Sequence, residues 1–83
     1  MKAVKKVLAL PLSPVEKIIL LDYIFAGALS DEGACLKHGD VARAAGIVLK
    51  SAVTHCHALQ AQGLLVATGE RRGLVRAFRV ALP

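Results

Sequence analysis

The chain has 83 residues, 55% of them apolar but only three aromatic, and its formal net charge is +5. This length has room for one modest hydrophobic core, built mainly from aliphatic side chains, so we expect a single domain over 1–83 and no disordered chain. The charge is uneven: residues 1–36 hold four basic and four acidic side chains, whereas residues 37–83 hold seven and two. A basic half of this kind is typical of a surface that meets a polyanion.

The first twelve residues are predicted to be an extended segment, either an edge strand at 4–10 or a basic arm. The apolar stretch that follows its lysines is short and contains Pro11, so no targeting segment is expected. The apolar run from Ile18 to Leu29 falls short of the roughly 20 residues that a membrane span needs. Two cysteines are too few to indicate a disulfide framework, which favours reduced thiols in the cytoplasm.

The sequence encodes a helix start at Ser13, which is followed by Pro14 and then by Glu16. Ser13 can accept a hydrogen bond from the amide of Glu16, the Glu16 side chain can return one, and proline fits the first helical position. The helix is expected to run to about Leu29. Its broad apolar face predicts a central helix that packs on two sides, through Ile18, Leu21, Phe25 and Leu29 together with Val15, Ile19, Ile24 and Ala28.

Two shorter helices are predicted after a polar turn at 30–33 and a brief strand at 34–36. The first spans 39–45 and stops at Gly46, which can adopt the left-handed conformation that ends helices. The second spans 48–62 and ends before Gly63. Its inward positions are Ala52, Cys56 and Leu59, which recur at helical spacing.

Beyond Gly63 the apolar period changes to two, which predicts strands at 64–68 and 74–82 joined by a charged tip at 69–73. The sequence therefore predicts an α+β fold with three helices and a C-terminal two-stranded hairpin. Short strands at 4–10 and 34–36 would add to the sheet.

The order of these elements, and the residues at their junctions, resemble a winged helix-turn-helix domain. The matching residues are VARAAGI at 41–47, Leu59, GLL at 63–65, and LSPVEKIILL at 12–21. They are similar to bacterial transcriptional regulators and to phage and plasmid replication-type domains, over about 12–82. The resemblance implies a homodimer that binds double-stranded DNA in the cytoplasm, associated with the nucleoid. Its role would be transcription regulation, or the maintenance or replication of a phage or plasmid.

The resemblance implies that 48–62 is a recognition helix in the major groove and that 69–79 is a basic wing. It places Val48, Leu49, Lys50, Ser51, Val53, Thr54 and His57 on the helix as candidate DNA contacts, with Ser51 the weakest. On the wing, Arg71 and Arg72 at the tip and Arg76 and Arg79 on the following strand form a basic group that can grip phosphates or enter a minor groove. Of these, Arg71, Arg72 and Arg76 are the candidate DNA contacts, and Lys37 and Arg43 complete the set. Relatives usually begin this helix with a Ser or Thr cap and arginines, whereas Val48, Leu49 and Val53 are apolar and read bases weakly.

Other functions have less support in the sequence. A metal site is suggested by the cysteines and histidines Cys35, His38, His55, Cys56 and His57. Successive residues of a helix turn by about 100°, however, so the last three cannot all face one ion.

The few acidic residues are scattered and no catalytic motif is present, so we expect no enzyme, cofactor or small-molecule ligand. The alternative function is a winged-helix module that binds protein rather than DNA, through its apolar helix face.

Overall fold

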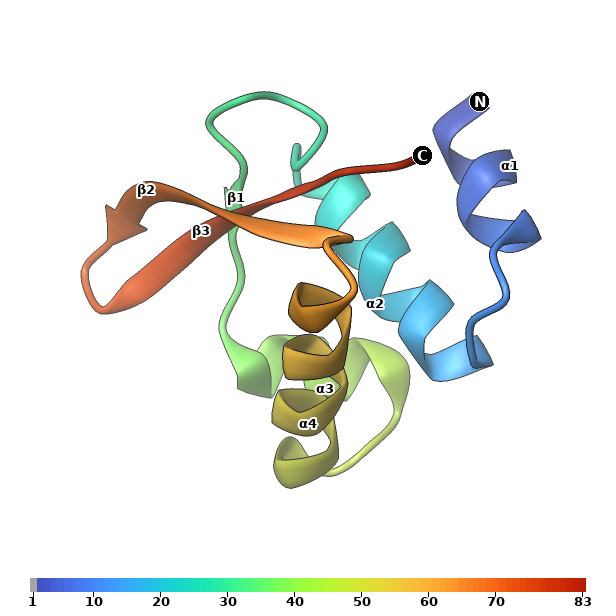
Figure 1. The fold of residues 1–83 in the computed structure, drawn as a ribbon. Helices are drawn as coiled ribbons and strands as arrows, with labels where there is room; N and C mark the ends of the chain where they lie inside the picture. Colours follow the sequence, from blue (N-terminus) through green and yellow to red (C-terminus); the bar gives the residue numbers. More distant parts are fainter. Residues whose placement is uncertain (1) are drawn as a thin grey trace.

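The computed structural model describes residues 2–83, which form an α+β fold of four helices and one antiparallel three-stranded sheet (Figure 1). The α+β class predicted from the sequence is confirmed, with one helix more than expected. The elements in chain order are α1 (Lys2–Ala9), α2 (Pro14–Phe25), β1 (Ala34–Cys35), α3 (His38–Ala45), α4 (Leu49–Ala61), β2 (Leu65–Arg72) and β3 (Val75–Val80).

Helix α1 replaces the strand or extended arm predicted at 4–10. Its apolar side chains Ala3, Val7 and Leu10 recur at helical spacing, and Val7 is fully buried against the core. The lysines fall on the exposed side, so the period is that of a helix and not of a strand. Lys17 of α2 donates a hydrogen bond from Nζ to the carbonyl oxygen of Leu8 at 2.7 Å, which fixes α1 to α2.

Helix α2 begins as predicted, but half of the predicted capping box is wrong. The Ser13 hydroxyl accepts a hydrogen bond from the amide of Glu16 at 3.3 Å. The Glu16 carboxylate does not return to Ser13. It lies 3.1 Å from Nδ1 of His55 on α4, so it joins two helices and does not complete the cap.

The end and the buried face of α2 also differ from the prediction. The helix ends at Phe25, four residues early, because Gly27 has φ +102 and the amide of Ala28 turns back to the carbonyl of Tyr23. The apolar side chains Ile18, Phe25 and Leu29, which were expected to pack, are exposed. The expected central position of the helix is confirmed, because α2 packs against α1 as well as against α3, α4 and β3. The buried face consists of Ile19, Leu20, Tyr23 and Ile24.

The two following helices agree with the sequence to within about one residue. Gly46 ends α3 with φ +69, as predicted, and α4 buries Ala52, Cys56 and Leu59. The predicted strand at 34–36 is present as β1, which pairs with β3. The β1–α3 connection is short, so β1 positions the N-terminus of α3 beside the sheet.

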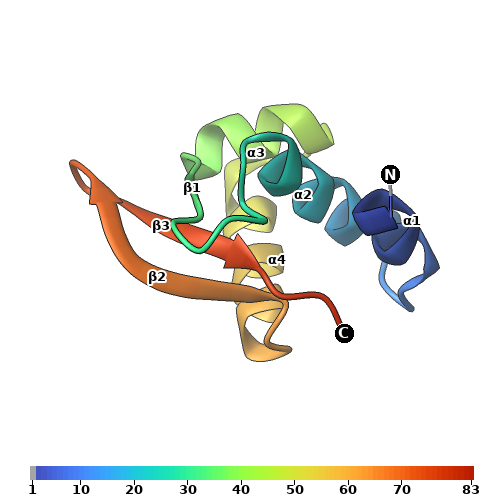
Figure 2. The same ribbon diagram turned by 90° about the horizontal axis from the view of Figure 1, so that it is seen from above.

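The hairpin differs most from the sequence prediction. The predicted tip at 69–73 is largely part of β2, and the turn consists of Gly73 and Leu74. The register shifts by two residues between Ala67 and Arg71, where Gly69 has φ +91 and forms a β-bulge. The bulge places Arg71 and Arg72 within a strand, and Figure 2 shows the hairpin projecting beyond the helices at the end opposite α1.

The core lies between the helices and the inner face of the sheet. Tyr23 and Phe78 are at its centre, with ring centroids 6.3 Å apart and planes at 85°. This edge-to-face pair joins α2 to β3, so the few aromatic residues do contribute to a core that is otherwise aliphatic. Val80 of β3 donates a backbone hydrogen bond to the carbonyl of Ala28 at 2.8 Å, which secures the end of the sheet.

Candidate nucleic-acid interface

Helix α4 presents one exposed polar stripe, formed by Lys50, Thr54 and His57. These residues are four and three positions apart, the spacing that places side chains on one helical face. The Thr54 hydroxyl donates to the carbonyl of Lys50 at 3.0 Å, which leaves its oxygen free to accept a further hydrogen bond. Val48 and Leu49 are exposed at the start of the helix, as predicted.

The remaining candidates on this helix are less accessible. Ser51 and Val53 are half-buried on opposite flanks of the stripe. They can contribute only at the edge of a surface centred on Lys50 and Thr54.

The arginines of the hairpin divide between the two faces of the sheet. Arg71 and Arg76 are direct cross-strand partners, and Arg76 alternates with Phe78 and so lies on the face that packs against the helices. Arg72 pairs with Val75 and lies on the opposite face. Two like charges directly opposite each other are destabilising in a sheet, and an anion between Arg71 and Arg76 would relieve that repulsion.

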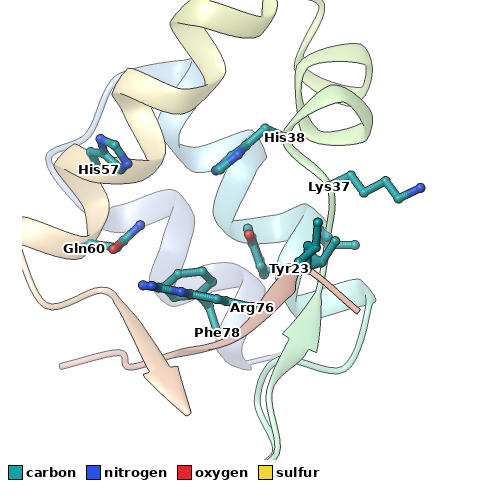
Figure 3. Close-up of a pocket in the computed structure, with 10 residues that line it drawn as sticks. Tyr23, Lys37, His38, His57, Gln60, Arg76 and Phe78 are labelled. Atoms are coloured by element: carbon teal, nitrogen blue, oxygen red, sulfur yellow. The ribbon is translucent and has the colours of Figure 1, made fainter. Parts of the chain in front are cut away.

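A groove of about 410 Å³ joins α4 to the hairpin (Figure 3). His57 and Gln60 border it from α4, His38 from α3, and Arg76 from the hairpin. The lining is completed by Tyr23, Leu36, Lys37, Leu74, Val75 and Phe78. The groove therefore connects the polar stripe of α4 with Arg76 through one concave surface.

Of the six predicted lysine and arginine contacts, only Lys37 and Arg76 border this concave surface. The Lys37 side chain points away from the groove although the residue borders it (Figure 3). Arg43 is exposed on α3, about 140° around the helix from His38, which faces the groove. Arg72 borders a separate hollow on the other face of the sheet.

The two faces of the hairpin differ in charge. The hollow on the outer face contains the carboxylates of Glu32 and Glu70 beside Arg71 and Arg72. No carboxylate is among the ten residues that line the groove on the α4 side. In the part of the chain that the structure describes, the one ion pair joins His55 to Glu16, so the lysines and arginines there keep their charge available for other partners.

The sequence analysis missed several groove residues, namely Tyr23, Leu36, His38, Gln60, Leu74, Val75 and Phe78. Nothing local in the sequence indicates that Phe78 forms the floor of a groove. His38 and Gln60 border the same groove because β1 sets the start of α3 beside the hairpin. No signal in the sequence identifies these residues, because only the tertiary structure brings them together.

No protein-family model, curated protein or solved structure matches the chain. Within residues 2–83, no group of three or more His, Cys, Asp or Glu side chains converges as a metal site would require. No helix of that same stretch is long and apolar enough to cross a membrane.

Two buried side chains that lose a proton at alkaline pH, Tyr23 and Cys56, should make the stability of the fold depend on pH in that range. Burial raises the pKa of the Tyr23 hydroxyl above its ordinary value of 10.0 and that of the Cys56 thiol above 9.0. Both groups ionise more readily in the unfolded chain, so their contribution to stability is complete below about pH 9 and is lost as the pH rises further. We expect the free energy of unfolding, from urea denaturation, to fall above pH 9, by at most about 1.4 kcal/mol per pH unit for each proton released.

The variants Tyr23→Phe and Cys56→Ala separate the two contributions to this alkaline loss. Each should make the decline shallower, Cys56→Ala from about pH 9 and Tyr23→Phe from about pH 10. A decline of unchanged steepness in the double variant would show that other groups cause it.

Proposed function

We propose that this chain is a winged helix-turn-helix domain that binds double-stranded DNA. The observation that carries the proposal is the groove without carboxylates that joins His57 of α4 to Arg76 of the hairpin. A helix and an arginine-bearing β-ribbon that border one concave surface can meet the same polyanion. The element order supports the proposal, because a helix, a short strand, two helices and a hairpin follow one another as in the domains that the sequence resembles.

In the proposed complex α4 lies in the major groove, which is wide enough to admit a helix. Lys50 and Thr54 would meet base edges, since the first turns of a recognition helix approach the bases. Arg71 and Arg76 would hold backbone phosphates, which position the domain without reading sequence. With Val48 and Leu49 at the helix start, we propose that phosphate contacts supply most of the affinity.

The proposed role is transcription regulation, or maintenance or replication of a phage or plasmid, by a homodimer associated with the nucleoid in the cytoplasm. A dimer is favoured because one module of this size buries little surface on DNA. Two recognition helices would also read two half-sites. The proposal includes no catalytic residue and no cofactor.

A second candidate function is a winged-helix module that binds protein. Val48, Leu49 and Leu74 favour it, because they are large apolar side chains with 69%, 56% and 96% of their surface exposed. They lie at the start of α4 and at the hairpin turn. Exposed apolar side chains of this kind can mark a protein interface.

Binding to a fluorescently labelled random-sequence duplex, followed by anisotropy, separates the two functions. We expect binding at micromolar protein in about 50 mM salt, weakening steeply towards about 200 mM. The logarithmic slope should be about −0.9 for each phosphate neutralised. No change in anisotropy at low salt would contradict DNA binding and favour the protein-binding module.

A further inference from the structure

The groove between α4 and the hairpin has the size and the lining of a small-molecule binding site. Its volume of about 410 Å³ lies within the range of ligand pockets. Its apolar and aromatic lining comes from Tyr23, Leu36, Leu74, Val75 and Phe78, and its polar groups come from His38, His57, Gln60 and Arg76. An apolar surface with a few polar groups around it is typical of sites that hold a flat organic ligand.

The Tyr23 hydroxyl is a polar group at the groove that has no hydrogen-bond partner within residues 2–83. The residue has only 1% of its surface exposed, and its hydroxyl points into the groove (Figure 3). It makes no hydrogen bond to any other residue in the described range. None of the fully buried side-chain polar atoms of the described residues lacks a partner, so this hydroxyl is still open to water, which a ligand in the groove would replace as its partner. Since burial raises its pKa, the hydroxyl keeps its proton and can donate.

The charge of the groove favours an anion. Arg76 brings a permanent positive charge, and none of the ten lining residues is acidic. The N-terminus of α3 opens beside His38, and its cap residue Lys37 makes no side-chain hydrogen bond to the free amides. The positive end of a helix adds to the attraction for an acid group.

We infer that this groove binds a small planar organic anion of the size of an aromatic carboxylate. Its ring would lie against Leu36, Leu74 and Val75, the apolar lining residues that reach the surface, and its carboxylate would meet Arg76 and the start of α3. Inorganic phosphate alone would leave most of the volume and the apolar surface unfilled. The ligand would also accept the hydrogen bond that Tyr23 offers.

The position of the site gives the ligand a regulatory effect, and this step rests on the proposed function. His57 and Arg76 belong both to the groove and to the surface proposed to meet DNA. An anion bound there would neutralise Arg76 and occupy the space between helix and ribbon. Ligand and duplex would therefore compete, and each would lower the affinity for the other.

The site is tested on the free protein by titration with 2-naphthoate, with 2-naphthalenemethanol as the neutral analogue of the same ring. In amide NMR spectra, 2-naphthoate should shift the resonances of His38, His57 and Arg76, and the neutral analogue should bind more weakly. Tyr23→Phe keeps the ring and should lower the affinity about 3- to 10-fold. Arg76→Gln should lower it about 10-fold or more, whereas Arg72→Gln, on the opposite face, should not change it.

Shifts confined to residues outside the groove would overturn the inference, as would equal affinity for the neutral analogue. An unchanged affinity in both Tyr23→Phe and Arg76→Gln, with their thermal unfolding near that of the parent, would do the same. The competition is tested separately, by adding 2-naphthoate to the protein–duplex complex. If the ligand occupies the groove but leaves duplex affinity unchanged, the regulatory step is wrong. If no duplex binds at all, the proposed function fails while the ligand site stands.

Discussion

Replacing Arg71 and Arg76 together by glutamine should weaken binding to every duplex sequence, about 10-fold or more in 50 mM salt. The two residues are direct cross-strand partners, so they would hold adjacent phosphates. Arg76 borders the groove on the α4 side, whereas the Arg71 side chain reaches the hollow on the outer face. Loss of two phosphate contacts should also reduce the logarithmic salt slope by about 1.8. Fluorescence anisotropy over a salt series measures both quantities.

The matched control is the double change Arg72→Gln and Arg79→Gln, which removes the same charge from the other face of the sheet. Arg72 pairs with Val75, and Arg79 alternates with Ala77 on that outer face. It should change duplex affinity by much less than the first variant. Equal losses in the two variants would mean that net charge, and not a face of the hairpin, determines binding.

The largest expected effect on stability comes from Gly33→Ala, at the entrance to β1. A Cβ atom there would lie 2.6 Å from the carbonyl oxygen of Phe78 and 2.9 Å from Cγ2 of Thr68, and the residue has φ +73. Thr68 also donates a hydrogen bond from its hydroxyl to the carbonyl of Glu32 at 3.1 Å, so the bulge and β1 are locked together. We expect a loss of roughly 2 kcal/mol or more in the free energy of unfolding, measured in urea.

Gly63→Ala is the matched control for the backbone conformation. Its φ of +77 is nearly the same, but a Cβ atom there would meet nothing within 4 Å. It should cost about 1 kcal/mol, the penalty for a left-handed residue with a side chain. If both variants lost the same stability, the close approach of β1 to β3 would not be rigid.

The residues that end and cap helices were predictable because their signals are local. Gly46 and Gly63 adopt the positive φ values that helix ends require, and Ser13 caps the helix that it precedes. The inward positions Cys56 and Leu59 followed from helical spacing alone. These signals depend on a few neighbouring residues, so tertiary structure does not override them.

The sequence predictions were wrong where tertiary contacts determine which of two locally possible structures forms. Helix α2 is apolar on most of its surface, so spacing alone could not decide that Tyr23 faces the core while Phe25 is exposed. The bulge at Gly69 shifts the pairing of β2 by two residues, and the turn moved accordingly to Gly73 and Leu74. Glycines at both ends of a charged segment allow either position for the turn.

The candidate site was predictable in part. The outward positions of Lys50, Thr54 and His57 were implied by the resemblance, and the arginines were recognised as a basic hairpin. Arg71 and Arg72 lie on opposite faces because successive residues of a strand alternate, but the sequence did not predict that both belong to a strand and not to the tip. The groove and its hydroxyl from Tyr23 require α2, α3, α4 and the hairpin to be assembled.

The most direct test of one shared DNA-facing surface is the map of amide NMR shifts when a short duplex is added to the protein. We predict that the amide resonances of Lys50, Thr54 and His57 shift together with those of Arg71 and Arg76, while those of Cys35 and Ala77 on the outer sheet face do not. Shifts of the hairpin without α4, or of the outer face in place of the groove, would contradict it.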